Sequence, residues 1–199
     1  MLELISISKK FDSEIFSDYS FKFTTNKIYH LKGRNGSGKS TLLKMIKGIY
    51  LHDEGNIIFT FGKNKKDDVV YIDGNFRSFF HRMSVKQNLE YFFSLLNKEK
   101  NLTYLNNLIA FFKISELQNK KFSSLSQGQM QLISVIRGLS SNSKVLLLDE
   151  VFSSLDTSYK EIVSSYLLEY VKKNEALVIF TSHDNHFKNT SNFEEICLN

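Results

Sequence analysis

Residues 33–41 of this chain read Gly33-Arg34-Asn35-Gly36-Ser37-Gly38-Lys39-Ser40-Thr41. The stretch fits the pattern G-x-x-x-x-G-K-[ST], in which glycines permit backbone angles that turn successive N–H groups into one concavity. An apolar strand is expected before it, at Ile28 to Leu31, and a helix after it, from Lys39 to Lys47 with a stop at Gly48. A strand, a glycine-rich loop and a helix N-terminus in this order predict a site for a phosphate chain.

Two side chains of this loop have predicted chemical roles. Lys39 is expected to reach the β and γ phosphates of a bound nucleotide, and Ser40 to offer its hydroxyl to Mg²⁺. The whole stretch from Gly33 to Thr41 is predicted to bind the nucleotide. The alternative is a glycine-rich turn that holds a lysine by chance, and the flanking strand and helix argue against it.

A pair of acids follows a second apolar segment. Val145 to Leu148 predicts a buried strand, and Asp149 and Glu150 stand at its carboxyl end, where open α/β sheets bind their ligands. Asp149 is predicted to hold Mg²⁺ through a water, and Glu150 to act as general base or to orient an attacking water. Solvated acids often end a strand, but their pairing with a phosphate loop favours the chemical interpretation.

The rest of the chain predicts an α/β fold around these two elements. Further strands are expected at Leu2 to Ser8, Tyr19 to Phe23, Gly55 to Phe61, Val69 to Ile72 and Leu177 to Phe180. Helices are expected at Ser84 to Asn97, Leu102 to Phe112, Ser126 to Leu139, and from Asp156 or Thr157 to about Lys173. Buried strands separated by helices imply a mainly parallel sheet covered on both faces, here with an N-terminal antiparallel β part and an all-helical insert.

We therefore expect a single domain over residues 1–199. Residues 1–74 and 140–199 would form the α/β core with its β part, and residues 75–139 the helical part. A length of 199 residues with 42% hydrophobic and 24% charged residues is typical of a globular domain. The absence of proline excludes collagen-like and proline-rich sequence.

Composition also indicates which cellular location and which kinds of partner to expect. No apolar run approaches the roughly 20 residues that a membrane span needs, and the N-terminus is not expected to be a signal peptide. A single cysteine, Cys197, fits a reducing cytoplasmic compartment. The net charge is +5, and the densest basic run, Lys63 to Lys66, precedes Asp67 and Asp68. That run is interpreted as a solvated hairpin loop, so no nucleic-acid partner is expected.

A third motif resembles the signature of a known protein family. Leu125-Ser126-Gln127-Gly128-Gln129 resembles the L-S-G-G-Q signature of ATP-binding cassette (ABC) ATPases, with Gln127 as the one substitution. The phosphate loop, this signature and the Walker B acids Asp149 and Glu150 follow in the family's order. Ser154-Leu155-Asp156 resembles the D-loop, and His183 in Thr181-Ser182-His183-Asp184 resembles the switch histidine. The resemblance covers essentially the whole chain and implies the ABC ATPase variant of the P-loop NTPase fold.

The resemblance implies a dimeric mechanism. In the family, each ATP lies between the P-loop of one subunit and the signature of the other, in a head-to-tail dimer with two equivalent sites. A second ATPase subunit, taken as another copy of this chain, is therefore expected. The family's switch histidine contacts the γ phosphate, and its adenine-stacking aromatic residue matches Phe11. The alternative for His183 is a histidine on a surface loop. The alternative for Phe11 is a phenylalanine in the core or in a hairpin.

One family element departs from its pattern. The family's Q-loop glutamine is expected just after the strand Val69 to Ile72, where this chain has Asp73, Gly74 and Asn75. Asn75 is the closest amide, and it is one methylene shorter than glutamine. The following stretch, Arg77 to Leu89, resembles that of several exporter-type ATPases. In the family it lies near the groove that receives the membrane subunit, although its aromatic residues could also pack within the helical part.

The resemblance implies an ATP-binding and ATP-hydrolysing subunit of an ABC transporter. Its cofactors would be ATP and Mg²⁺, its partner a separate membrane-spanning subunit, and its location the cytoplasmic face of the membrane. One alternative is a non-transport ABC ATPase acting on nucleic acid or ribosomes. The 90 positions between Gly38 and Gly128 carry no sustained heptads, and the chain has one cassette, both of which disfavour that reading. A small-molecule kinase is the other alternative, disfavoured by the signature and His183.

Overall fold

The computed structural model describes residues 1–61, 68–96, 102–182 and 192–198. Its strands are β1 (Leu2–Lys10), β2 (Glu14–Phe23), β3 (Lys27–Lys32), β4 (Glu54–Phe59), β5 (Val69–Ile72), β6 (Val145–Leu148), β7 (Leu177–Thr181) and β8 (Phe193–Cys197). Its helices are α1 (Lys39–Lys47), α2 (Val85–Leu96), α3 (Thr103–Phe111), α4 (Gln127–Ser140) and α5 (Thr157–Asn174), with 3₁₀ turns η1 (Ser115–Leu117), η2 (Phe122–Ser124) and η3 (Val151–Ser154).

A five-stranded parallel sheet forms the centre, in the order β5-β6-β7-β3-β8. Strands β6 and β7 are buried along their whole length, because helices or a second sheet cover both faces. Parallel pairing brings the carboxyl ends of β3, β5, β6 and β7 to the same edge. The P-loop leaves that edge after β3, and the two acids leave it after β6.

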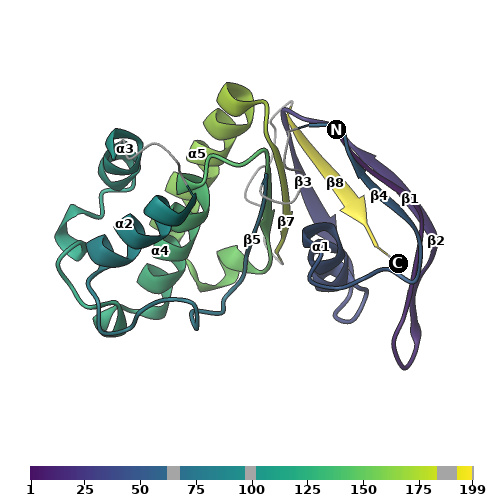
Figure 1. The fold of residues 1–199 in the computed structure, drawn as a ribbon, viewed down its shortest axis with the longest axis horizontal. Coiled ribbons are helices and arrows are strands. Elements are labelled where there is room, and N and C mark those ends of the chain that lie inside the picture. Colours follow the sequence, from purple (N-terminus) through teal and green to yellow (C-terminus); the bar gives the residue numbers. More distant parts are fainter. Residues whose placement is uncertain (62–67, 97–101, 183–191, 199) are drawn as a thin grey trace.

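The N-terminal part forms a separate antiparallel sheet in the order β2-β1-β4. Helix α1 lies between this sheet and the parallel sheet (Figure 1). One buried cluster joins α1 to both sheets, with Leu42 and Leu43 packed among residues such as Leu4 and Leu147. The P-loop helix is therefore held from two sides.

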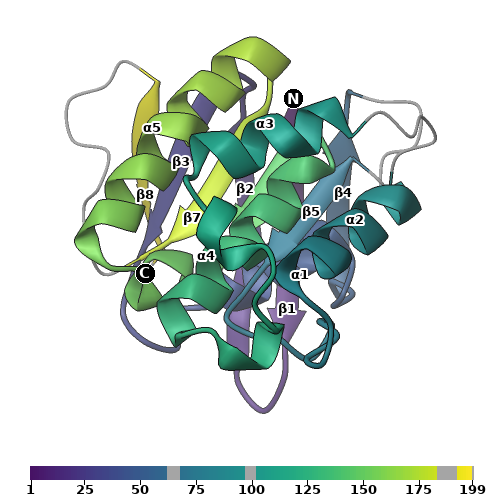
Figure 2. The same cartoon turned by 90° about the vertical axis from the view of Figure 1, so that its left-hand side faces the viewer.

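The remaining helices cover the opposite face of the parallel sheet (Figure 2). A second buried cluster joins α2, α3, α4 and α5 to the sheet residues that alternate with those facing α1, such as Leu146, Leu148 and Phe180. None of the helices in the described part of the chain is long and apolar enough to cross a bilayer.

The predicted fold class is confirmed, and several element bounds are corrected. Helix α1 and strand β5 have the predicted bounds. Strand β2 begins at Glu14 rather than Tyr19, because register shifts let an irregular stretch pair with β1, which itself runs to Lys10. Strand β4 ends at Phe59 rather than Phe61. The basic run from Lys63 to Lys66 lies outside the described residues.

Strand β8 was not predicted from the sequence. Its five residues, Phe193 to Cys197, include two glutamates, and no apolar run or alternation marks them as a strand. The strand forms because β3 offers a free edge, to which β8 adds in parallel from Ile28 to Lys32. This pairing brings the C-terminal segment beside the start of the P-loop.

Candidate active site

The P-loop closes around its glycines. Gly38 has a φ of 90°, and a Cβ there would lie 2.6 Å from Ile15 and 2.8 Å from the Phe16 ring. A side chain at this position would combine backbone strain with a collision against the antiparallel sheet. Glycine therefore allows the loop to turn into α1 while packing against β2.

Lys39 extends back along the loop that precedes it. Its side chain is largely buried, and its Nζ donates to the carbonyl oxygens of Gly33 at 2.8 Å and Arg34 at 3.0 Å. The ammonium group is thus held over the concave side of the loop. A phosphate entering there would meet a cation that is already placed, together with the N–H groups at the start of α1.

A cavity of about 440 Å³ opens at this loop. It is lined by residues of the P-loop and the start of α1, by Ile15 of β2 and by the second acid after β6: Ile15, Asn35, Gly36, Gly38, Lys39, Ser40, Thr41 and Glu150. The fold therefore brings residues from two predicted motifs, more than 100 positions apart, to one cavity. Its combination of amide, ammonium, hydroxyl and carboxylate groups suits a phosphate chain and a reacting water.

Asp149 lies beside Ser40 and is held by three hydroxyl groups. Its side chain is 6% exposed. Oδ1 accepts from Ser40 Oγ at 2.8 Å and from Thr181 Oγ1 at 3.0 Å, and Oδ2 accepts from Tyr71 Oη at 2.7 Å. Burial, followed by the hydrogen bond to Asp149, raises the pKa of the Tyr71 hydroxyl above its usual value, so Tyr71 remains a donor.

Glu150 adopts a backbone conformation that few non-glycine residues adopt. Its φ is 55°, in the left-handed region, and its N–H donates to Thr181 Oγ1 at 2.8 Å. The turn ends β6 abruptly and brings Glu150 to the wall of the cavity. Such strain of about 1 kcal/mol or more is often found at functional sites.

The donors present fit a magnesium ion that is bound together with phosphates. Ser40 and Asp149 offer a hydroxyl and a carboxylate oxygen that already contact each other, and Mg²⁺ prefers oxygen ligands. No group of three or more His, Cys, Asp or Glu side chains gathers among the described residues. Ser40 and Asp149 would supply two ligands, and phosphate oxygens and waters the rest, which is the usual arrangement for Mg²⁺.

The signature residues form the start of α4. Ser126 Oγ accepts from the Gln129 N–H at 3.2 Å, and Gln129 Oε1 accepts from the Ser126 N–H at 3.1 Å, which completes a capping box. Gln127 Nε2 lies 3.5 Å from Ser154 Oγ. Within the described chain, the lining of the P-loop cavity contains no residue from Leu125 to Gln129.

Asp156, at the predicted D-loop, begins the next helix. Its Oδ1 accepts from the Tyr159 N–H at 2.9 Å and the Ser158 hydroxyl at 2.8 Å, so the side chain caps α5. The hydrogen bond from the Tyr159 N–H has the larger effect and that from the Ser158 hydroxyl the smaller, and together they hold the pKa of the Asp156 carboxyl below its usual value.

Three other predicted residues lie apart from this cavity or outside the description. Phe11 stands on the turn between β1 and β2, is 50% exposed and contacts the Tyr50 ring edge to face at 5.7 Å. Asn75 uses its Oδ1 to accept from the Arg77 N–H at 3.0 Å. His183 lies outside the described residues.

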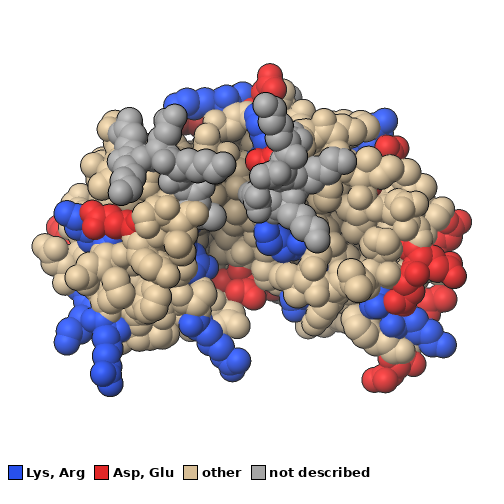
Figure 3. All heavy atoms as spheres, viewed as in Figure 1, with Lys and Arg blue, Asp and Glu red and all other residues tan. Residues whose placement is uncertain are grey.

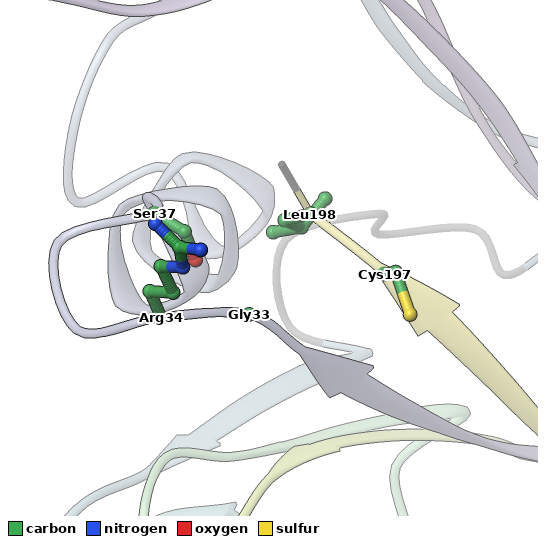
Figure 4. A pocket seen from close by; sticks show the side chains of 5 residues that line it. All are labelled: Gly33, Arg34, Ser37, Cys197 and Leu198. Atoms are coloured by element: carbon green, nitrogen blue, oxygen red, sulfur yellow. The ribbon is translucent and has the colours of Figure 1, made fainter.

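A second cavity lies where the P-loop meets the C-terminal segment. It has a volume of about 450 Å³ and is lined by Gly33, Arg34, Ser37, Cys197 and Leu198 (Figure 4). The Leu198 N–H donates to the Lys32 carbonyl at 2.7 Å, and a Cβ on Gly33 would lie 2.6 Å from the Leu198 oxygen. The sequence analysis did not anticipate this contact, because it depends on β8.

Sequence reasoning also missed two hydroxyl groups at the site. Tyr71 and Thr181 both bind the Asp149 carboxylate, yet each looks like an ordinary residue of a β-strand. The available signal was their position near the carboxyl ends of strands that flank β6, but strand order was needed to use it.

The chain is similar in sequence to known ATP-binding proteins. A family model described as ABC transporter matches residues 16–153. The chain is 32% identical over 180 residues to the cytochrome c biogenesis ATP-binding export protein CcmA of Reclinomonas americana, covering 87% of this chain and 81% of that protein. It is 28% identical over 187 residues to the zinc import ATP-binding protein ZnuC of Ehrlichia ruminantium, covering 94% and 74%.

A solved structure has the same fold. It is described as an ATP-binding protein of an ABC transporter from Pyrococcus furiosus, and it superposes with a TM-score of 0.80 at 24% identity, covering 98% of this chain and 96% of that one. At this level of identity the likeness concerns the fold alone.

Proposed function

Because this chain belongs to the ABC transporter family of ATP-binding proteins, we propose that it hydrolyses ATP and thereby drives a separate membrane-spanning subunit. The observation that carries the proposal is the shared cavity, where Lys39 and Ser40 of the P-loop lie with Glu150 beside the buried Asp149. These groups can bind a phosphate chain, place a metal and receive a proton within one site.

The proposed mechanism gives each residue one task. The P-loop N–H groups and Lys39 bind the β and γ phosphates, and Ser40 and Asp149 hold Mg²⁺, which when bound neutralises charge on those phosphates. Glu150 orients a water and takes its proton as the water oxygen bonds to the γ phosphorus. The bond from that phosphorus to the β–γ bridging oxygen breaks, and ADP and phosphate leave.

We propose that the site is completed by a second copy of the chain. The signature residues stay out of the P-loop cavity of their own subunit, whereas the Ser126 hydroxyl, which accepts from Gln129, keeps its own proton to donate. A head-to-tail dimer would bring that hydroxyl and the N-terminus of α4 to the γ phosphate of the partner. Asp156 would lie at the dimer contact, and His183 at the γ phosphate.

The helical part, residues 75–139, is the proposed docking site for the membrane subunit. A cavity of about 250 Å³ lies between β5, α2 and α4 and is lined in part by Ser78, Phe92, Leu95 and Arg137. The Arg137 guanidinium lies 4.1 Å from the centre of the Phe79 ring and donates to Ser78 Oγ at 2.7 Å. Burial lowers the pKa of Arg137 to about 10, which leaves it charged at neutral pH.

A role on nucleic acid is the second candidate, and charge distribution disfavours it. The net charge is only +5, and on the face seen in Figure 3 a group of basic side chains at the lower left does not continue across the molecule, whose right edge is mainly acidic. Nucleic-acid binding usually relies on a sustained basic surface. We therefore favour the membrane-associated role, at the cytoplasmic side of the membrane.

The proposal is tested first by nucleotide binding. Lys39→Ala removes the cation at the P-loop, so ATP affinity measured by calorimetry with Mg²⁺ should fall about 100-fold. Lys44→Ala is the matched control, because Lys44 lies on the same helix with its ammonium over the Tyr50 ring. Equal ATP affinity in all three proteins would remove the P-loop assignment.

The transport role needs its own test. We expect a reading frame beside the gene to encode a multi-span membrane protein. The purified chain, mixed with membranes that contain that protein, should bind them and hydrolyse ATP faster than with membranes that lack it. Hydrolysis that instead responds only to added DNA or ribosomes would favour the second candidate.

A further inference from the structure

We propose that Tyr71 is a positioning residue for the carboxylate of Asp149 and thereby sets the affinity of the site for its divalent metal. This inference rests on the proposed function, in which Asp149 and Ser40 hold Mg²⁺. It concerns a residue outside the P-loop, the signature and the acid pair.

The sheet places Tyr71 where its hydroxyl can reach Asp149. Tyr71 of β5 pairs in parallel with Leu147 of β6, and side chains two positions apart on a strand share a face. Leu147 and Asp149 are two positions apart, so the tyrosine ring rises beside Leu147 towards the carboxylate. The Asp149 N–H also donates to the Ile72 carbonyl at 2.8 Å, which extends the pairing of the two strands to the acid itself.

The two carboxylate oxygens have different partners. Oδ1 accepts from Ser40 and from Thr181, which belong to the P-loop helix and to β7. Of the described residues, Tyr71 alone donates to Oδ2, at 2.7 Å. Three hydroxyls on three elements therefore fix both the position and the rotation of the carboxylate, and Tyr71 is the one that fixes its Oδ2 end.

Removing the Tyr71 hydroxyl would free that end. Asp149 is 6% exposed, so Oδ2 would lose a donor in a place where water has little access. Oδ2 would then move while Oδ1 keeps its hydrogen bonds to Ser40 and Thr181. The carboxylate oxygen that faces the metal would no longer be held in one place. Loss of such an outer partner typically lowers metal affinity 10-fold to 100-fold.

The test compares two tyrosine hydroxyls that donate at opposite ends of β6, one from β5 and the other from α5. Tyr71→Phe removes the donor at the carboxyl end of β6. The control, Tyr170→Phe, removes a hydroxyl that donates to the Ser143 carbonyl, also at 2.7 Å, just before β6 begins. Electron paramagnetic resonance measures Mn²⁺ affinity in the presence of a non-hydrolysable ATP analogue, because Mn²⁺ accepts the same oxygen ligands as Mg²⁺.

We expect Tyr71→Phe to weaken Mn²⁺ binding about 10-fold, while nucleotide binding without metal stays at the wild-type value. Hydrolysis should recover part of its rate at high Mg²⁺ concentration. Tyr170→Phe should retain wild-type Mn²⁺ affinity. Wild-type Mn²⁺ affinity in Tyr71→Phe would overturn the inference.

A second variant covers a failure to fold, which thermal unfolding would reveal. Thr181→Val removes a donor from Asp149 Oδ1 with little change of shape, so it should weaken Mn²⁺ binding several-fold, within the range seen for outer partners. Thr181→Ser keeps the donor, so it should bind Mn²⁺ with wild-type affinity. Wild-type affinity in Thr181→Val would also overturn the idea that outer hydroxyls set metal affinity. A wild-type chain that binds no Mn²⁺ with nucleotide would instead reject the proposed function.

Discussion

The P-loop helix α1 and the signature helix α4 both begin with glycine-containing segments, but their first turns are satisfied in different ways. At α1 the N-terminal flanking residue is Gly38, which has no side chain to accept from the helix. At α4 it is Ser126, whose hydroxyl and backbone N–H form a reciprocal capping box with Gln129. Every helix leaves its first N–H groups without partners inside the helix.

This difference shows how the two helix starts can take part in one site. The first turn of α1 lies at a cavity of about 440 Å³, with Lys39 and Ser40 beside it, so a ligand can supply the missing acceptors. The first turn of α4 is stable without a ligand, because its own side chains supply two of the hydrogen bonds. In the proposed dimer, helix α1 would hold a nucleotide alone, and α4 would approach a nucleotide that the other subunit already holds.

The largest expected effect concerns turnover at the α1 cavity. Glu150→Gln keeps the size of the side chain but removes its capacity to take a proton, so kcat should fall about 1000-fold. ATP binding should remain, and sizing chromatography with ATP and Mg²⁺ should show an accumulated dimer.

Glu161→Gln, on an exposed part of α5, is the control and should turn over at the wild-type rate. A monomer as the only species of Glu150→Gln in ATP and Mg²⁺ would count against the dimeric mechanism. It would also remove the reason for treating α4 as the second half of the site.

A smaller set of changes is expected at α4. Ser126→Arg places a long cation at the capping position, so hydrolysis should fall about 100-fold while ATP binding by the isolated subunit keeps its wild-type affinity. Hydrolysis is followed by phosphate release and binding by calorimetry. Ser124→Arg, two residues earlier and also exposed, should change neither. If Ser126→Arg prevents binding by the isolated subunit, the two helix starts belong to one site in one chain.

The smallest expected effect is on stability without nucleotide. Ser126→Ala removes the acceptor for the Gln129 N–H, so the free energy of unfolding in denaturant should fall by about 1 kcal/mol. Ser165→Ala, within α5, removes a hydroxyl that bonds only within its own helix and should cost less. An unchanged stability for Ser126→Ala would mean that the α4 start is not self-satisfied, and the contrast with α1 would disappear.

Local sequence patterns predicted each α-helix and each strand of the described residues except β8. The three glycines that precede Lys39 and Ser40 predicted the loop, and Gly48 predicted where its helix ends, because glycine acts through the backbone angles at its own position. The apolar run from Val145 to Leu148 predicted a buried strand because it lacks a polar face. The family resemblance added the expected roles of the signature and of His183.

Tertiary structure decided which side chains meet. The three hydroxyls on Asp149 come from Ser40, Tyr71 and Thr181, which are 109, 78 and 32 positions away along the chain. Periodicity reports which face of an element is buried, but it carries no information on which strand lies next to which. The strand order β5-β6-β7-β3-β8 supplies that information, and it also creates β8, whose own sequence gives no strand signal. The sequence by itself therefore determined the phosphate loop and the acids, whereas packing between distant segments determined how the acid beside the loop is held.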